Sequence, residues 1–198
     1  MTDRGKESLS RSQMQAKPRI EDVIPDYLGG EKRQAALDFV QFLRANKMSP
    51  SWVSANTWKA GYRGKGICGV GIRTPEGGNN RGYYGRPGGE PSFVIFPALP
   101  HMDEYKAQIM EEGLQDIIWN NAFYCVCSAK NRSLGKGCNP NKPCAGGKTI
   151  TVLGREIENI CLGHLVIWVF DPDEAAVSGI KRLLELEQKA RAEHSGKQ

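Results

Sequence analysis

The stretch TWKAGYRGKGICGVGIR, residues 57–73, decides the fold, because it contains two extended runs joined by a glycine-rich turn. Residues 57–62 and 66–73 flank the sequence RGKG at 63–66, a pattern that predicts an antiparallel hairpin. Residues 64–69 also fit the G-x-G-x-x-G motif of dinucleotide-binding proteins. That motif acts between a strand and a helix, so its position inside a hairpin argues against such a function.

Helices and further strands surround this hairpin. Apolar spacing predicts helices over residues 31–46, 102–112 and 114–123, and strands over 92–96, 149–153 and 165–170. The last strand is apolar on both faces, which predicts a central place in its sheet. Hairpins that are segregated from helices favour an α+β fold, with a mainly antiparallel sheet, packed helices and an irregular cysteine-rich loop.

A long final helix follows these strands. Asp171 is expected to cap its N-terminus, since an aspartate before an apolar period is a helix-start signal. Two i,i+4 pairs, Glu185 with Lys189 and Glu187 with Arg191, are predicted to be exposed ion pairs on its surface.

The chain of 198 residues, 39% of them hydrophobic and 25% charged, is long enough for one globular core. Residues 1–19 lack periodicity and predict a flexible N-terminal arm, followed by a single domain over 20–194 with a cysteine-rich loop at 125–148. No apolar run approaches the roughly 20 residues of a membrane-spanning helix. The N-terminus also lacks the apolar stretch of a secretory signal, so we expect a cytoplasmic protein without a membrane partner.

Positive charge gathers in the middle of the chain. Residues 44–89 hold eight Lys or Arg and one acid, and residues 125–149 hold five and none. Aromatic rings that stack on a ligand, beside cations that hold its phosphates or carboxylates, form an anion-binding or base-stacking site. The alternative is that the tryptophans belong to the core and the cations are merely solvated. The candidate ligand-binding residues are Trp52, Trp58, Tyr62, Arg63, Lys65, Arg81, Tyr83 and Arg86.

Cysteines mark the region after residue 124. Four thiolates in one loop are a common structural site for zinc, which accepts tetrahedral sulfur ligands. In the cytosol thiols stay reduced, which favours a structural zinc ion over disulfides, with free or redox-active thiols as a further alternative. The candidate metal ligands are Cys125, Cys127, Cys138 and Cys144, with Cys161 competing for a place in the set.

The remaining cysteine and the histidines carry weaker signals. Cys68 has apolar neighbours and is expected in the core. His164 follows Cys161 by three residues, whereas His101 and His194 are expected to be solvated surface residues. No stretch carries a complete catalytic signature.

The motifs W-K at 58–59 and Y-x-G-K at 62–65, followed by the apolar run 92–96, the cysteine loop and the run 149–161, resemble those of uncharacterised bacterial cysteine-motif proteins. The chain is more distantly similar to the effector-binding domains of multidrug-responsive transcription regulators. That resemblance implies an α+β unit with a small-molecule cavity.

Together these patterns predict a non-enzymatic protein that binds a small molecule or an anion and is stabilised by a structural zinc site. One alternative is a nucleic-acid-associated zinc-binding protein that uses the basic, aromatic middle of the chain. A second is a thiol-dependent enzyme with Cys68 as its nucleophile.

Overall fold

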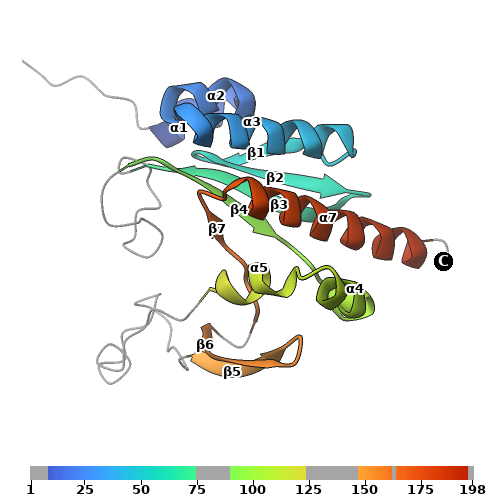
Figure 1. Ribbon diagram of the computed structural model, residues 1–198. Helices are drawn as coiled ribbons and strands as arrows, with labels where there is room; N and C mark the ends of the chain where they lie inside the picture. The colour runs from blue at the N-terminus through green and yellow to red at the C-terminus, as the bar shows by residue number, and fades with distance from the viewer. Residues whose placement is uncertain (1–8, 75–89, 124–146, 162–163, 196–198) are drawn as a thin grey trace, which may run out of the picture.

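The computed structural model describes residues 9–74, 90–123, 147–161 and 164–195 (Figure 1). None of the helices in these ranges is both long and apolar enough to cross a membrane. In chain order the elements are α1 (Leu9–Ala16), α2 (Ile20–Tyr27), α3 (Gly30–Ala45), β1 (Pro50–Ser54), β2 (Thr57–Tyr62), β3 (Lys65–Arg73), β4 (Ser92–Pro97), the 3-10 helix η1 (Met102–Tyr105), α4 (Lys106–Glu111), α5 (Gln115–Asn120), β5 (Gly147–Val152), β6 (Arg155–Cys161), β7 (Val169–Phe170) and α7 (Glu174–Ser195).

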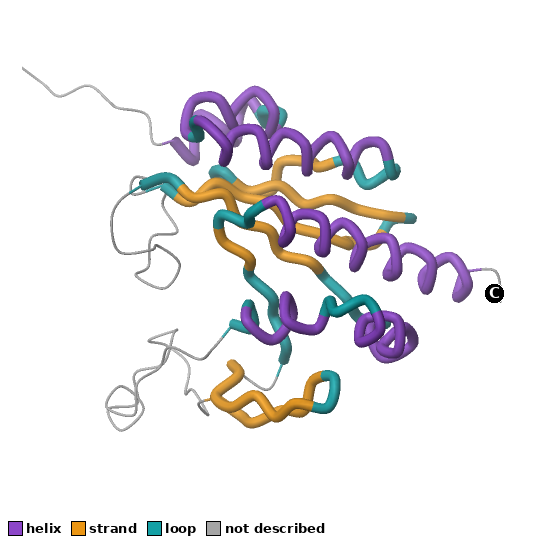
Figure 2. The backbone as a smooth tube through the Cα atoms, in the orientation of Figure 1, coloured by secondary structure: helices purple, strands orange, loops and turns teal. Residues whose placement is uncertain are grey.

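Five strands form one antiparallel sheet in the order β1-β2-β3-β4-β7, and β5 and β6 form a separate two-stranded sheet. Helices α1 to α3 lie together on one side of the large sheet (Figure 1). Figure 2 shows the β5–β6 hairpin set apart from that sheet, near α5. There the indole N–H of Trp119 donates to the carbonyl of Val152 at 2.9 Å. This architecture confirms the predicted α+β fold.

The β2–β3 hairpin forms where the sequence predicts it. Its two-residue turn has positive φ at both positions, 49° at Arg63 and 76° at Gly64. Turns of this kind match the right-handed twist of the strands that they join. The predicted helix over 31–46 corresponds to α3.

The side of the sheet that faces the helices supplies the core. Trp58 of β2 pairs in register with Val70 of β3, which pairs with Ile95 of β4, and all three side chains are fully buried. Phe39 of α3 packs against Phe93 of β4, with ring centroids 6.3 Å apart. Successive strand residues point to opposite faces, so the neighbours of these core residues point away from the helices.

The folded part of the chain begins earlier than the predicted boundary at residue 20, because α1 packs against the sheet. The Gln13 side chain is buried and donates to Asn56 Oδ1 at 2.6 Å, while the Asn56 N–H donates to Gln13 Oε1 at 2.7 Å. The amide of Gln13 thus satisfies the side-chain oxygen and the backbone N–H of Asn56. Asn56 turns the chain between β1 and β2 with φ 51°. Because Gln13 and Asn56 are polar, apolar periodicity does not reveal this contact.

The predicted central strand over 165–170 is instead short and lies at one end of the sheet order. Only β7 pairs with β4, and Ile167 makes an isolated bridge to Ala122. Trp168 packs its ring against Phe96 with centroids 4.6 Å apart. Residues 165–170 are therefore apolar on both faces because they pack against aromatic side chains at the end of the sheet. They do not form a strand between two neighbouring strands.

The cap of α7 is Asp173 and not the predicted Asp171. The Asp173 carboxylate accepts the N–H of Ala176 at 2.8 Å. Asp171 instead accepts the N–H of Phe93 at 2.9 Å and the ammonium of Lys32 at 3.2 Å, which fastens β4 and α3 to the start of α7.

We predict that Asp173→Ala lowers the free energy of unfolding by about 1 kcal/mol, because it leaves an N-terminal N–H of the helix without its acceptor. Urea unfolding measures the change. Glu174→Ala is the matched control: it removes a charge from the same helix end, where the expected cost is only about 0.3–1 kcal/mol from the helix dipole. A larger loss for Glu174→Ala than for Asp173→Ala would contradict this assignment of the cap.

Candidate functional site

A groove of about 420 Å³ opens beside the β2–β3 turn. Ser51 of β1 and Lys59 of β2 are register partners in its floor, and they point away from the helix side that Trp58 faces. The groove therefore lies on the outer side of the sheet. Its lining consists of lysines, serines and glycines: Lys47, Ser49, Ser51, Lys59, Gly61, Gly64, Lys65 and Gly66.

Lys47 reaches the groove from a helix end of unusual composition. The N–H of Lys47 donates to the carbonyl of Arg44 at 3.1 Å, and that of Met48 donates to Leu43 at 2.8 Å, which is the Schellman arrangement. Lys47 occupies the left-handed position of this motif, with φ 59°. Glycine is the usual residue there, and a side chain in this conformation costs about 1 kcal/mol.

Lys59 extends across β3 because residue 66 has no side chain. A methyl group at Gly66 would lie 2.1 Å from Cε of Lys59. The stem of Lys59 therefore passes directly over the glycine backbone. Lys65, the first residue of β3, adds the third cation of the lining.

No carboxylate neutralises these lysines within the described ranges. The groove lining contains no Asp or Glu. Within residues 9–74, 90–123, 147–161 and 164–195, Lys47, Lys59 and Lys65 form no ion pair. Three like charges on one concave surface give a positive potential that attracts anions.

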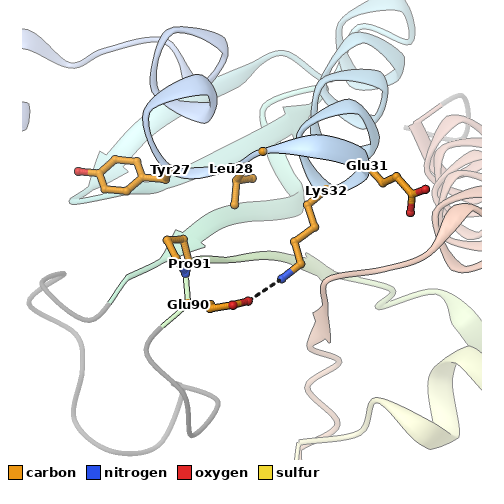
Figure 3. Close-up of a pocket in the computed structure, with 7 residues that line it drawn as sticks. Tyr27, Leu28, Glu31, Lys32, Glu90 and Pro91 are labelled. Atoms are coloured by element: carbon orange, nitrogen blue, oxygen red, sulfur yellow. Dashed lines mark ion pairs between the residues drawn. The ribbon is translucent and has the colours of Figure 1, made fainter.

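A second groove, of about 670 Å³, has a different character (Figure 3). Lys32 points across it toward Glu90, with Nζ and Oε2 4.0 Å apart, and it also pairs with Asp171 at 3.2 Å. Its single lysine is thus already paired with acids, and we assign it no ligand. The lining residues are Tyr27, Leu28, Gly29, Glu31, Lys32, Glu90 and Pro91.

The predicted tryptophans lie on the helix side of the sheet. Trp58 is fully buried and its indole N–H donates to the carbonyl of Pro18 at 2.8 Å, so it is a core residue and not a ligand contact. Trp52 is half-buried and donates to Gln13 Oε1 at 3.3 Å. Neither tryptophan lines one of the two grooves described above.

The other predicted ligand contacts fall in three places: the hairpin turn, the groove and the part of the chain outside the described residues. Arg63 places its guanidinium over the Tyr62 ring, 5.5 Å from the centroid, at the hairpin turn. Lys65 lines the groove, while Lys47 and Lys59 join it without having been predicted. Arg81, Tyr83 and Arg86 lie outside the described residues.

The four principal candidate zinc ligands, Cys125, Cys127, Cys138 and Cys144, also lie outside the described residues. Cys161 ends β6, where it pairs in register with Gly147. A structural zinc ion therefore stays a prediction. Cys68 is buried as expected, and its burial raises the pKa of the thiol, which disfavours the thiolate that a nucleophile requires.

A buried polar network supports the groove from behind. Arg191 donates from Nε to Glu187 Oε1 at 2.7 Å, and both side chains of this pair are withdrawn from solvent. Arg191 also donates to the carbonyl of Gly66 at 3.1 Å and of Lys65 at 3.4 Å. The prediction that the pair of Glu187 and Arg191 is exposed is wrong, because the pair faces the sheet. Arg191 fixes two backbone carbonyls of the groove.

Comparisons with known proteins gave no relative: no family model, no curated protein and no solved structure matches this chain. The similarity to effector-binding domains therefore stays a prediction.

We predict that Arg191→Met lowers the free energy of unfolding by about 3 kcal/mol, because it leaves the Glu187 carboxylate buried without its cation. Lys189→Met is the matched control, since Lys189 is exposed on the same helix and an exposed substitution changes stability by at most about 0.5 kcal/mol. Urea unfolding of both variants measures the difference. Equal losses would contradict the role of the buried pair.

For the cysteine loop we predict that Cys138→Ser releases zinc, because a hydroxyl is a poor substitute for a thiolate ligand. Native mass spectrometry of reduced protein counts the ion. Cys68→Ala should retain the metal, since Cys68 is buried in the core. Metal-free wild-type protein, with the five thiols other than the buried Cys68 titrating freely, would overturn the zinc site.

Proposed function

We propose that this protein binds a small anionic ligand, bearing a phosphate or carboxylate group, in the groove beside the β2–β3 turn. The observation that carries the proposal is the convergence of Lys47, Lys59 and Lys65 on one concave surface whose lining contains no acid. The three lysines come from the end of α3, from β2 and from β3, so the tertiary fold brings them together.

The size and chemistry of the groove favour a small ligand. Pockets for small molecules occupy roughly 300–1,000 Å³, and the groove volume of about 420 Å³ falls within that range. The glycines at 61, 64 and 66 leave the backbone open to close approach. The lysines and serines of the lining are hydrogen-bond donors that suit a phosphate or carboxylate.

The backbone at Lys47 adds a separate argument. A lysine at a left-handed helix end is destabilising relative to glycine, and strain of this kind is characteristic of functional positions. Binding of an anion by the ammonium group is a use that offsets the strain. In this proposal a zinc ion on the cysteines Cys125, Cys127, Cys138 and Cys144 is structural and is not part of the groove.

We predict that Lys47→Gly weakens the binding of inorganic pyrophosphate about fivefold, while the free energy of unfolding stays the same or rises by up to about 1 kcal/mol. The affinity falls because one attractive charge is removed. The free energy of unfolding is kept or raised because glycine adopts the positive φ without strain. Amide chemical-shift titration, followed at Gly61 and Gly64, measures the affinity, and urea unfolding measures stability.

Two further variants make the test specific. Gly66→Ala keeps every charge but displaces the Lys59 stem, so it should also weaken pyrophosphate binding. Lys106→Gln removes an exposed cation outside the groove lining and should leave the affinity unchanged. Equal losses for Lys106→Gln and Lys47→Gly would refute the groove and leave only a net-charge effect. Much tighter binding of an oligonucleotide than of pyrophosphate, with a steep salt dependence, would favour the nucleic-acid alternative.

A further inference from the structure

Three side chains with metal-binding chemistry meet where α7 ends against η1. The nitrogen and oxygen ligand atoms of His101, Glu104 and His194 all lie within 4.8 Å of one another. His194 Nε2 lies 2.7 and 2.9 Å from the two carboxylate oxygens of Glu104. The imidazole of His101 stacks on that of His194 with ring centroids 5.0 Å apart.

A buried carboxylate orients His101. Glu187 is fully buried, its Oε1 lies 2.8 Å from Nδ1 of His101, and its Oε2 accepts the backbone N–H of the same residue at 3.2 Å. Glu187 thus holds the ring and the backbone of His101 together. Packing of the His101 side chain alone would not require both of these hydrogen bonds.

The other partners of Glu187 determine which His101 nitrogen bears the proton. Arg191 and Tyr105 both donate to this carboxylate, each at 2.7 Å. The carboxylate therefore acts as an acceptor toward His101 as well, so Nδ1 of His101 is the donor of this contact and Nε2 takes no part in it.

We propose that His101, Glu104 and His194 bind a divalent transition-metal ion of the zinc class. A carboxylate on the second ring nitrogen is the usual support of a metal-binding histidine, because it fixes the tautomer and the ring orientation. Imidazole nitrogen with one carboxylate oxygen suits zinc and its neighbours. Three protein ligands also leave a coordination position for water or an external ligand.

Access to the three residues indicates an exchangeable ion. The side chains of His101, Glu104 and His194 are 28%, 44% and 52% exposed. An ion entering from solvent replaces the hydrogen bond between Glu104 and His194. The site is independent of the lysine groove, since the two have no side chain in common.

The composition of the chain makes a direct test practical, because it contains only three histidines. Imidazole NMR signals of the full-length, reduced protein are followed during titration with Zn²⁺. The expected result is that the signals of His101 and His194 shift together and saturate, while those of His164 do not follow the same titration curve. Zinc taken up by cysteines does not produce this pattern, because the signals report on the imidazoles.

Variants then test the ligand set. Glu104→Gln and His194→Gln alter exposed side chains, so the fold is expected to persist, and each should weaken zinc binding at the remaining imidazoles at least tenfold. His164→Gln is the matched control and should leave it unchanged. The proposal is overturned if zinc shifts all three histidines alike, if it shifts none of them, or if Glu104→Gln binds as tightly as the wild type. Any of these results identifies a hydrogen-bonded cluster that does not serve as a metal site.

Discussion

A carboxylate and a guanidinium that leave water must both find partners, because an unpaired buried charge is strongly destabilising. Glu187 and Arg191 meet this constraint at the end of α7 and connect it to three other parts of the fold. Glu187 accepts from His101 and Tyr105 at η1. Arg191 reaches the carbonyls at the start of β3 and that of Ala98 after β4. The position of the last helix over the sheet is therefore specified by directional bonds as well as by apolar contact.

Both candidate sites depend on this ion pair, but through different partners. On one side Arg191 fixes the backbone of Lys65 and Gly66, over which the Lys59 stem lies. On the other side Glu187 fixes the ring of His101. The pair contributes no side chain to the groove lining or to the cluster of metal-type ligands. Its part is to hold the groups that do, and a rigid support of this kind is what a preorganised site requires.

Local patterns predicted the hairpin, α3 and the helical part of the C-terminus, because each has a period and a turn signal that depend on neighbouring residues alone. The pair Glu187 and Arg191 was predicted to be exposed but is buried. Of the other predicted pair, Glu185 lies 3.4 Å from Arg182, and within the described residues it forms no ion pair with Lys189. A signal was nevertheless present. The buried residues Ile180, Leu184, Glu187 and Arg191 follow each other at spacings of four, three and four, so the charged pair continues the apolar stripe of the helix. The prediction of the cap failed for a different reason: the Asp171 carboxylate accepts the N–H of Phe93 in β4, whereas the Asp173 carboxylate accepts the helix N–H of Ala176.

The sites themselves depend on residues that break local rules. Lys47 stands at a helix end where glycine is expected, Gly66 leaves a strand without a side chain, and a charged pair occupies an apolar stripe. Each exception weakens a structural prediction when it is taken alone. In space they belong to one end of the sheet, where the hairpin, the end of α3 and α7 converge. Sequences that fold well are locally consistent, and functional or strained sites are where departures from that consistency are expected. That argument favours the lysine groove and its buried support over a merely solvated surface.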